Sequence, residues 1–178
     1  MPRCSTAILS LLCLCIAACA SHESASSSNS AAASGAKPCT MTDGRHDVLR
    51  VSPPADAPCD ASPGSLAIRS RQGHVFIWLV PGATSVDDAV SVVAKTIESE
   101  FKRFKTTRTS TLTLPGEKAP ATRLMGSGVE ADDDDPGTAD VIVFRRGSRV
   151  FIACAHGEHL RDSAQQLLLS LVESSSVP

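Results

Sequence analysis

Short apolar runs, separated by turn-forming residues, organise the chain between residues 47 and 80. They predict three strands, at 47–52, 65–70 and 74–80, with a Pro-rich loop at 53–64. The third run, HVFIWLV, is apolar on both faces, which favours a central place in a sheet. A Gln-Gly turn signal separates the second run from the third, so we expect these two strands to form a hairpin.

A helical period follows the third strand. Apolar residues recur at three- and four-residue steps from Val86 to Phe104, which is the spacing of one helical stripe. Thr84 and Ser85 are candidate N-caps, and Asp88 completes a capping-box pattern with Asp in place of Glu. The sequence therefore predicts one long helix across this stretch.

Four more strands and a second helix complete the predicted domain. Strand patterns lie within 106–114, 118–129, 139–145 and 149–155, and a last apolar stripe predicts a helix from 157 to about 172. A polar loop, EADDDDPG, separates the second of these strands from the third. The expected order is β-β-β-α-β-β-β-β-α. Consecutive hairpins predict an α+β fold, an antiparallel β-sheet packed by two helices.

The first 19 residues have the pattern of a secretory signal, because Arg3 precedes an apolar run that ends at Ile16. This run is too short to span a membrane as a helix, which needs about 20 apolar residues. The tetrapeptide Ile16-Ala17-Ala18-Cys19 resembles the bacterial lipobox. That resemblance implies cleavage before Cys19, attachment of diacylglycerol to the Cys19 thiol and acylation of the new amino terminus. An ordinary signal peptide is the alternative.

Three parts follow from this pattern: a lipoprotein signal peptide at 1–18, a lipid anchor and Ser/Ala-rich tether at 19–37, and a single domain at 38–178. The tether carries no large apolar residue and is typical of a flexible linker. We expect the protein at the cell membrane, facing the periplasm or the exterior. Ala20, rather than Asp, follows the anchor, and the likeness to lipoproteins then favours the outer membrane where one exists; inner and outer membrane both stay open.

The predicted domain contains three cysteines, Cys39, Cys59 and Cys154. A protein exported from the cytoplasm can form disulfides, and three thiols allow one bridge with one thiol left over. Cys39 and Cys59 flank the first predicted strand, so a bridge between them would clamp its loops. Cys154 lies in an apolar run and is expected to be a buried free thiol. A pairing that includes Cys154 is the alternative.

Three stretches of the domain are similar to the PsbP-like family, the fold of an extrinsic photosystem II subunit and of many bacterial secreted domains. They are VLRVSPP at 48–54, SVDDA at 85–89 and VIVFRRGSRVF at 141–151, and the similarity covers most of 47–172. The chain lacks the aromatic residue that usually follows the Pro-Pro pair. The resemblance implies an adaptor, assembly or stabilising role at a membrane surface. The family shares no active site, so no functional residue carries over.

Two groups of side chains are candidate metal ligands. An acidic run supplies the carboxylate oxygens that calcium prefers, although it lacks EF-hand spacing; its members are Asp132, Asp133, Asp134 and Asp135. His156 and His159 would share one face of the last helix, where two imidazoles at this step can bind zinc or copper. The alternatives are a solvated loop and polar residues at a helix entry.

Net charge is −2, which gives no support for binding nucleic acid. The chain has no G-x-S-x-G sequence, phosphate loop or dinucleotide fingerprint, so we expect neither an enzyme nor a cofactor. The expected function is a membrane-anchored, non-enzymatic binding, adaptor or assembly module with a protein partner in the cell envelope. The alternative is a lipoprotein that binds a metal ion or small ligand through the acidic loop or the His156/His159 pair.

Overall fold

The computed structural model describes residues 37–117 and 120–178. The predicted signal peptide, Cys19 and the tether up to residue 36 lie outside the described residues. The described strands are β1 (Cys39–Thr42), β2 (Asp47–Val51), β3 (Cys59–Ser62), β4 (Ser65–Ser70), β5 (Gly73–Leu79), β6 (Phe101–Leu112), β7 (Ala121–Glu130), β8 (Pro136–Arg146) and β9 (Arg149–Gly157). The helices are α1 (Val86–Val90), α2 (Val93–Thr96) and α3 (Asp162–Ser174).

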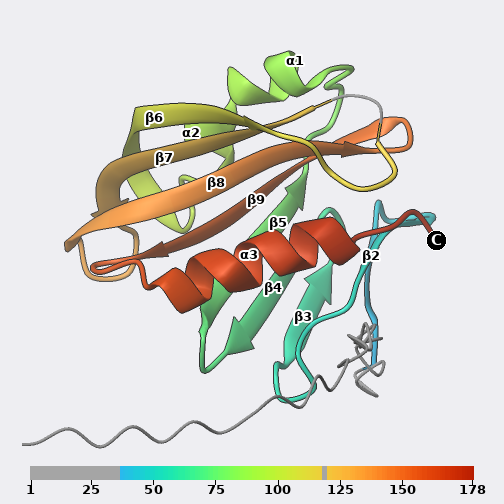
Figure 1. Cartoon of the computed structure of the whole chain (residues 1–178), viewed down its shortest axis with the longest axis horizontal. Coiled ribbons are helices and arrows are strands. Elements are labelled where there is room, and N and C mark those ends of the chain that lie inside the picture. The colour runs from blue at the N-terminus through green and yellow to red at the C-terminus, as the bar shows by residue number, and fades with distance from the viewer. Residues whose placement is uncertain (1–36, 118–119) are drawn as a thin grey trace, which may run out of the picture. The chain divides into compact units, whose positions relative to one another are not determined.

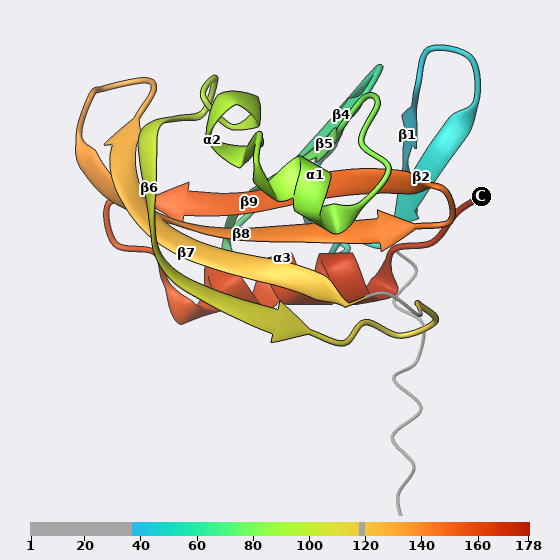
Figure 2. The same cartoon turned by 90° about the horizontal axis from the view of Figure 1, so that it is seen from above.

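One antiparallel sheet of seven strands, in the order β3-β4-β5-β9-β8-β7-β6, forms the centre of the fold. Helix α3 lies along one face, and α1 and α2 lie on the other (Figures 1 and 2). Strands β1 and β2 pair separately as a two-stranded sheet. The α+β class and the antiparallel pairing are confirmed, including the predicted β4–β5 hairpin and the place of β5 inside the sheet.

Two hydrophobic cores result because β8 and β9 bury side chains on both faces. Towards α3, the stacked rings of Phe144 and Phe151 pack with Leu167 and Leu171. Towards α1 and α2, the core residues are Val141, Val143, Ile152 and Cys154 from the sheet and Val93 and Ile97 from the helices. Alternate residues of a strand point to opposite faces, so a run without polar positions is what a strand between two helical layers requires.

The β1–β2 hairpin extends the core beside α3, with Met41 and Leu49 fully buried. A disulfide joins Cys39 of β1 to Cys59 of β3, which is the pairing that the sequence favoured. Cys154 is a buried free thiol, and burial raises its pKa far above that of an ordinary cysteine. The bridge therefore attaches the small sheet to the edge of the large one.

The long helix predicted from Val86 to Phe104 is wrong. The capping box of Ser85 and Asp88 is present, but the helix is broken into α1 and α2, and β6 begins at Phe101. Phe101 and Phe104 instead lie over Gly128 and Gly126 of β7, where any added Cβ would collide with their rings. Phenylalanines at helical spacing therefore belong to a strand, because β7 leaves room for them.

Three further boundaries differ from the prediction. The last helix begins at Asp162 rather than near residue 157, because β9 continues to Gly157 as the partner of β8. The loop predicted at 53–64 contains β3, a short and largely exposed edge strand that pairs with β4. Strand β1 was not predicted at all. No helix within residues 37–117 and 120–178 is long and apolar enough to cross a membrane.

Candidate functional site

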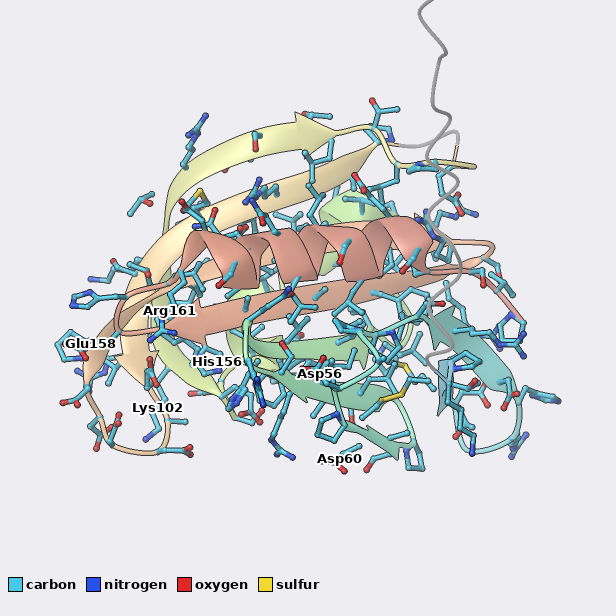
Figure 3. All side chains as sticks on the ribbon, turned by 60° about the horizontal axis from the view of Figure 1, so that its bottom comes forward. Asp56, Asp60, Lys102, His156, Glu158 and Arg161 are labelled. Carbon is cyan, nitrogen blue, oxygen red and sulfur yellow. A yellow bond between two sulfur atoms is a disulfide. The ribbon has the colours of Figure 1, made fainter. Side chains whose placement is uncertain are left out.

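A cavity of about 230 Å³ lies where the β4–β5 turn and the end of β9 meet the start of α3. Three segments that are distant in sequence supply its lining: Ser70, Arg71, Gln72, Gly73 and His74; His156 and Gly157; and His159, Leu160, Arg161 and Ala164. His156 and Arg161, both labelled in Figure 3, lie at this end of α3. The cavity is the best candidate site among the described residues because it combines a concave surface with convergent polar groups.

The walls of the cavity are held by contacts between α3 and the β4–β5 turn. Gly73 has a φ of 151°, and a Cβ added there would approach Ala164 Cβ to 2.6 Å. Ser163 Oγ donates a hydrogen bond of 3.0 Å to the Gln72 carbonyl. Ser70 Oγ accepts from the Gln72 amide at 3.0 Å. Close packing and these hydrogen bonds therefore fix the turn against the helix.

His156, near the end of β9, is one of the residues that line the cavity, and its side chain lies on the sheet face that carries α1 and α2. Its ring is flanked by Phe76 and Phe101, each with its ring centroid 5.6 Å away. Both ring nitrogens are buried, and neither has a hydrogen-bond partner among the described residues. Burial lowers the pKa of His156, and the neighbouring His74 lowers it further, while Asp132 acts in the opposite direction. This imidazole is therefore held neutral near neutral pH with donor and acceptor capacity unused.

The rim of the cavity carries cationic groups without anionic partners. Arg71 and Arg161 are both exposed, and neither forms a hydrogen bond or ion pair through its side chain with any described residue. No Asp or Glu lines the cavity. Arg161 is also the N-cap of α3 and contributes no side-chain cap. Other arginines of the domain, Arg45 and Arg50 among them, likewise have no side-chain hydrogen bond or ion pair with a described residue.

Known proteins offer no functional assignment. No family model and no curated protein sequence matches the chain. A solved structure from Bacteroides thetaiotaomicron VPI-5482 has a TM-score of 0.53 and 12% identity, over 80% of this chain and 48% of that chain. LpqN of Mycobacterium tuberculosis, described as involved in cell envelope biogenesis, has a TM-score of 0.42 and 14% identity, over 79% of this chain and 89% of its own.

These likenesses bear on the fold alone. The chain spans about half the length of the Bacteroides protein, which shares its architecture. The likeness to LpqN is too distant for a function to be read from it. The resemblance to the PsbP-like family remains a prediction. Function must therefore be argued from the residues of this chain.

The histidine pair is not arranged as the sequence predicted. His156 is on β9, and His159 is in the turn before α3, so they share no helix face. His159 is 91% exposed and lies 3.8 Å from Glu158. The cavity nevertheless brings both histidines together with His74. No group of three or more His, Cys, Asp or Glu residues within 37–117 and 120–178 has an arrangement that could hold a metal ion.

The acidic loop is exposed, and none of its residues lines the cavity, although Asp132 acts on the pKa of His156. Strands β7 and β8 shorten it to residues 131–135. Lys102 Nζ forms a 3.1 Å ion pair with Asp134 and donates a 3.0 Å hydrogen bond to the Ala131 carbonyl. Asp133 accepts from the Asp135 amide at 3.1 Å. A lysine and local hydrogen bonds therefore organise this loop, as expected of a solvated hairpin end.

Sequence reasoning missed the two arginines of the rim. Arg71 is in a turn between two short strands, and Arg161 is in a connection that was predicted to be helical. Neither belongs to a motif, and nothing in the sequence places them together. A usable signal in the sequence existed only for His156 and His159, which are close together and carry imidazoles that can bind metal ions.

Proposed function

We propose that this protein is a lipid-anchored, non-enzymatic binding module of the cell envelope. The observation that carries the proposal is the lipobox-like Ile16-Ala17-Ala18-Cys19 at the end of a short apolar run. Acyl chains on Cys19 would hold the chain at a membrane, since each buried methylene contributes about 0.8 kcal/mol and two or more chains anchor stably. The domain would then present its surfaces to a protein partner in the envelope.

Several potentially reactive groups of the domain are engaged in the fold, which favours binding over catalysis. The Cys154 thiol is fully buried, and its raised pKa opposes formation of a thiolate nucleophile. The buried carboxylate of Asp140 is paired with Arg123, whose Nη2 also lies 3.2 Å from Gln165. Ser70 Oγ is committed to the β4–β5 turn. These groups hold secondary structure elements together.

Metabolic labelling with an alkyne-tagged palmitate tests the anchor in a bacterial host that processes lipoproteins. The wild-type chain should take up label and fractionate with membranes. Cys19→Ser should lose both properties. Cys13→Ser, within the predicted signal peptide, is the matched control and should behave like the wild type. Equal labelling of the wild type and Cys19→Ser would overturn the proposed anchor.

A partner in the envelope is tested by cross-linking in living cells. A photoreactive amino acid placed at exposed positions on different faces of the domain should give a discrete adduct from one face only. The adduct should weaken when Cys19→Ser detaches the chain from the membrane. Adducts spread evenly over all faces, or none at all, would contradict an adaptor role.

A second candidate function is the binding of a small ligand, and the cavity beside α3 favours it. Three histidines line this cavity, and they form no metal-binding arrangement within the described residues. Calorimetric titration of the full chain with calcium and zinc tests what remains of the metal alternative. Saturable heat at micromolar metal would support a metal-binding protein, and its absence at millimolar metal would leave the cavity for other ligands.

A further inference from the structure

We infer that the exposed edge of β6 binds an extended, acidic segment of a protein partner, which adds to the large sheet as a further strand. This inference deepens the proposed function and rests on it, because it names the chemistry of the partner and the surface that receives it. The juxtaposition that carries it is a long, unpaired strand edge with charges of a single sign along it.

The large sheet has two edges, β3 and β6, and they differ in length and cover. Strand β3 has four residues, and the disulfide of Cys59 attaches it to β1. Strand β6 has twelve residues, lies outermost beside β7 (Figure 2) and pairs with no other described strand. Natural proteins keep sheet edges short or covered because the free N–H and C=O groups of an edge pair with other chains. A long open edge such as β6 is therefore suited to strand addition.

The second half of β6 has the regular geometry that strand addition needs. The pairing of β6 with β7 is irregular at two places, and both come before Arg108. From Arg108 to Leu112 each residue has one partner on β7, in unbroken register. Thr109 and Thr111 are exposed, and β-branched threonine favours the extended backbone of a strand. Irregular pairing therefore protects the first half of the edge and leaves the second half open.

Every charged side chain of β6 is cationic, in a chain whose net charge is −2. Lys102 forms an ion pair with Asp134. The other three cations, Arg103, Lys105 and Arg108, form no ion pair with a described residue. Lone cations occur elsewhere on the domain, but here they follow one another along an open strand edge. The edge therefore attracts a strand that carries carboxylates.

Two of these cations share one face of the sheet. Lys105 lies opposite Ser127 of β7. Arg108 lies opposite Met125, two residues away on the same strand, and alternate residues of a strand point to the same face. The side chains of a strand added to β6 would alternate in the same way, with Cβ atoms of opposed residues about 4.5–5.5 Å apart. Carboxylates at alternate positions of the partner would therefore lie beside Lys105 and Arg108.

Charge also distinguishes among the possible occupants of this edge. Two copies of β6 paired edge to edge would bring like charges together, which is destabilising. An anionic membrane surface would attract the cations but would leave the backbone groups of the edge without partners. An extended acidic segment satisfies both features, because its backbone hydrogen-bonds to the edge while its carboxylates pair with the cations.

Fluorescence anisotropy of the full chain in non-ionic detergent tests the inference. The probe is a fluorescein-labelled octapeptide in which Glu and Val alternate, and saturable binding is the expected result. A peptide with the same residues in two blocks, all Glu and then all Val, has the same charge and should bind roughly fivefold more weakly, because it loses the alternation.

Two N-methylated forms of the alternating peptide separate strand addition from attraction of charge alone. One form is methylated at the Glu amides and the other at the Val amides. Only every second amide of an added strand points towards β6. One form should therefore lose binding by roughly tenfold or more, as hydrogen bonds to the edge are removed, and the other should keep it.

Charge-removing variants locate the binding. The double variant Lys105→Gln, Arg108→Gln should bind the alternating peptide roughly fivefold more weakly, the loss expected when two cross-strand charge pairs are removed. The double variant Arg71→Gln, Arg161→Gln removes the same charge at the cavity and is the matched control, which should bind like the wild type. All four positions are exposed, so circular dichroism should show an intact fold in both variants.

Three outcomes in solution would overturn the inference. The first is no saturable binding of the alternating peptide. The second is equal binding of the parent peptide and both N-methylated forms, which would show attraction of charge alone. The third is that Lys105→Gln, Arg108→Gln weakens binding to phosphatidylglycerol vesicles and not to the peptide, which would assign the cations to a membrane surface.

Cross-linking in cells separates this inference from the proposed function. A photoreactive residue at Thr109 should give the adduct, and one at Ala61, an exposed position of the β3 edge, should not. An adduct from another face alone would overturn the inference and leave the proposed function standing. Loss of palmitate labelling, or no adduct from any face, would contradict the proposed function without changing the anisotropy, so the two fail separately.

Discussion

The two ends of α3 place arginines in opposite situations. At the C-terminal end, Arg146 is 4% exposed, and its Nε donates to the Ser175 carbonyl at 2.9 Å and to Ser175 Oγ at 3.0 Å. Its Nη2 donates to the Val172 carbonyl at 2.9 Å, and Glu117 lies 3.8 Å from Nη1. At the N-terminal end, Arg71 and Arg161 are exposed and unpaired among the described residues.

This difference separates a charge that serves the fold from charges available to a ligand. A helix ends with carbonyl groups that lack intrahelical partners, and a buried arginine satisfies them at the cost of its own desolvation. Burial accordingly lowers the pKa of Arg146, while Glu117 raises it. Arg71 and Arg161 are exposed, so they carry no such desolvation penalty, and their side chains make no hydrogen bond or ion pair that holds the described fold together. Their removal should spare stability, whereas removal of Arg146 should lower it.

The largest expected effect is at Arg146. Arg146→Leu should lower the free energy of unfolding by about 3 kcal/mol or more, because it strands buried carbonyl and hydroxyl groups at the end of α3. Urea denaturation measures the change. Arg145→Leu is the matched control, since Arg145 makes one 2.7 Å hydrogen bond to the Gly147 carbonyl, and it should cost about 1 kcal/mol. Equal losses in the two variants would contradict the role of Arg146.

Removal of the disulfide should have a comparable but smaller effect. The double variant Cys39→Ala, Cys59→Ala should lose about 3 kcal/mol, because the bridge closes a loop with a sequence separation of 20. Urea denaturation with and without reductant provides the measurement. Reductant should destabilise the wild type and leave the double variant unchanged. If reductant leaves the urea denaturation curve of the wild type unchanged, the bridge is absent from the protein.

His156 predicts a smaller, pH-dependent effect at the cavity end. Its lowered pKa means that the unfolded chain binds the proton more readily than the folded chain. This histidine therefore makes stability fall as pH decreases through about 6.5, and its contribution is fully present above that value. His156→Phe should flatten the dependence of the melting temperature between pH 7.5 and 5.5.

The comparison with His156→Phe is needed because other groups titrate nearby. Burial and Asp132 raise the pKa of Glu100, and burial with the acidic loop raises that of Glu130, so both act in the opposite direction at lower pH. The facing groups that act on His156 itself are His74 and Asp132. Identical pH profiles for the wild type and His156→Phe would show that another group controls this range.

The smallest expected effect on stability is at the rim. The double variant Arg71→Gln, Arg161→Gln should change the free energy of unfolding by less than about 0.5 kcal/mol, as is usual for exposed side chains without partners. Thermal and urea denaturation measure it. A loss as large as that of Arg146→Leu would remove the distinction between the two ends of α3 and would place the rim arginines among the groups that hold the fold.

The strands of the second half were predictable because their pattern is unambiguous. The run around Val141 and the run around Ile152 are apolar without interruption, which only a doubly covered strand needs. The stretch from Val86 to Phe104 was mispredicted because its helical period continues into residues that pair with β7. Strand β3 was missed because CDAS has no apolar period, and its pairing with β4 alone makes it a strand.

The candidate site was predictable only in part, for a related reason. His156 and His159 attract attention in sequence because they are close together, but the helix that should align them begins at Asp162. Arg71 and Arg161 give no signal of a site in the sequence, since single arginines in loops are common. Their relation to His156 exists only once the sheet order places β5 beside β9 and α3 packs on the β4–β5 turn.

The sequence alone determined the predicted membrane address and the fold class, because both depend on local order: a lipobox-like motif after a short apolar run, and apolar periods that distinguish strands from helices. Tertiary structure decided where strands end, which cysteines meet and which charges remain unpaired. Those properties depend on contacts between segments that are far apart in sequence, such as Gly73 with Ala164. Local pattern carries no information about such contacts.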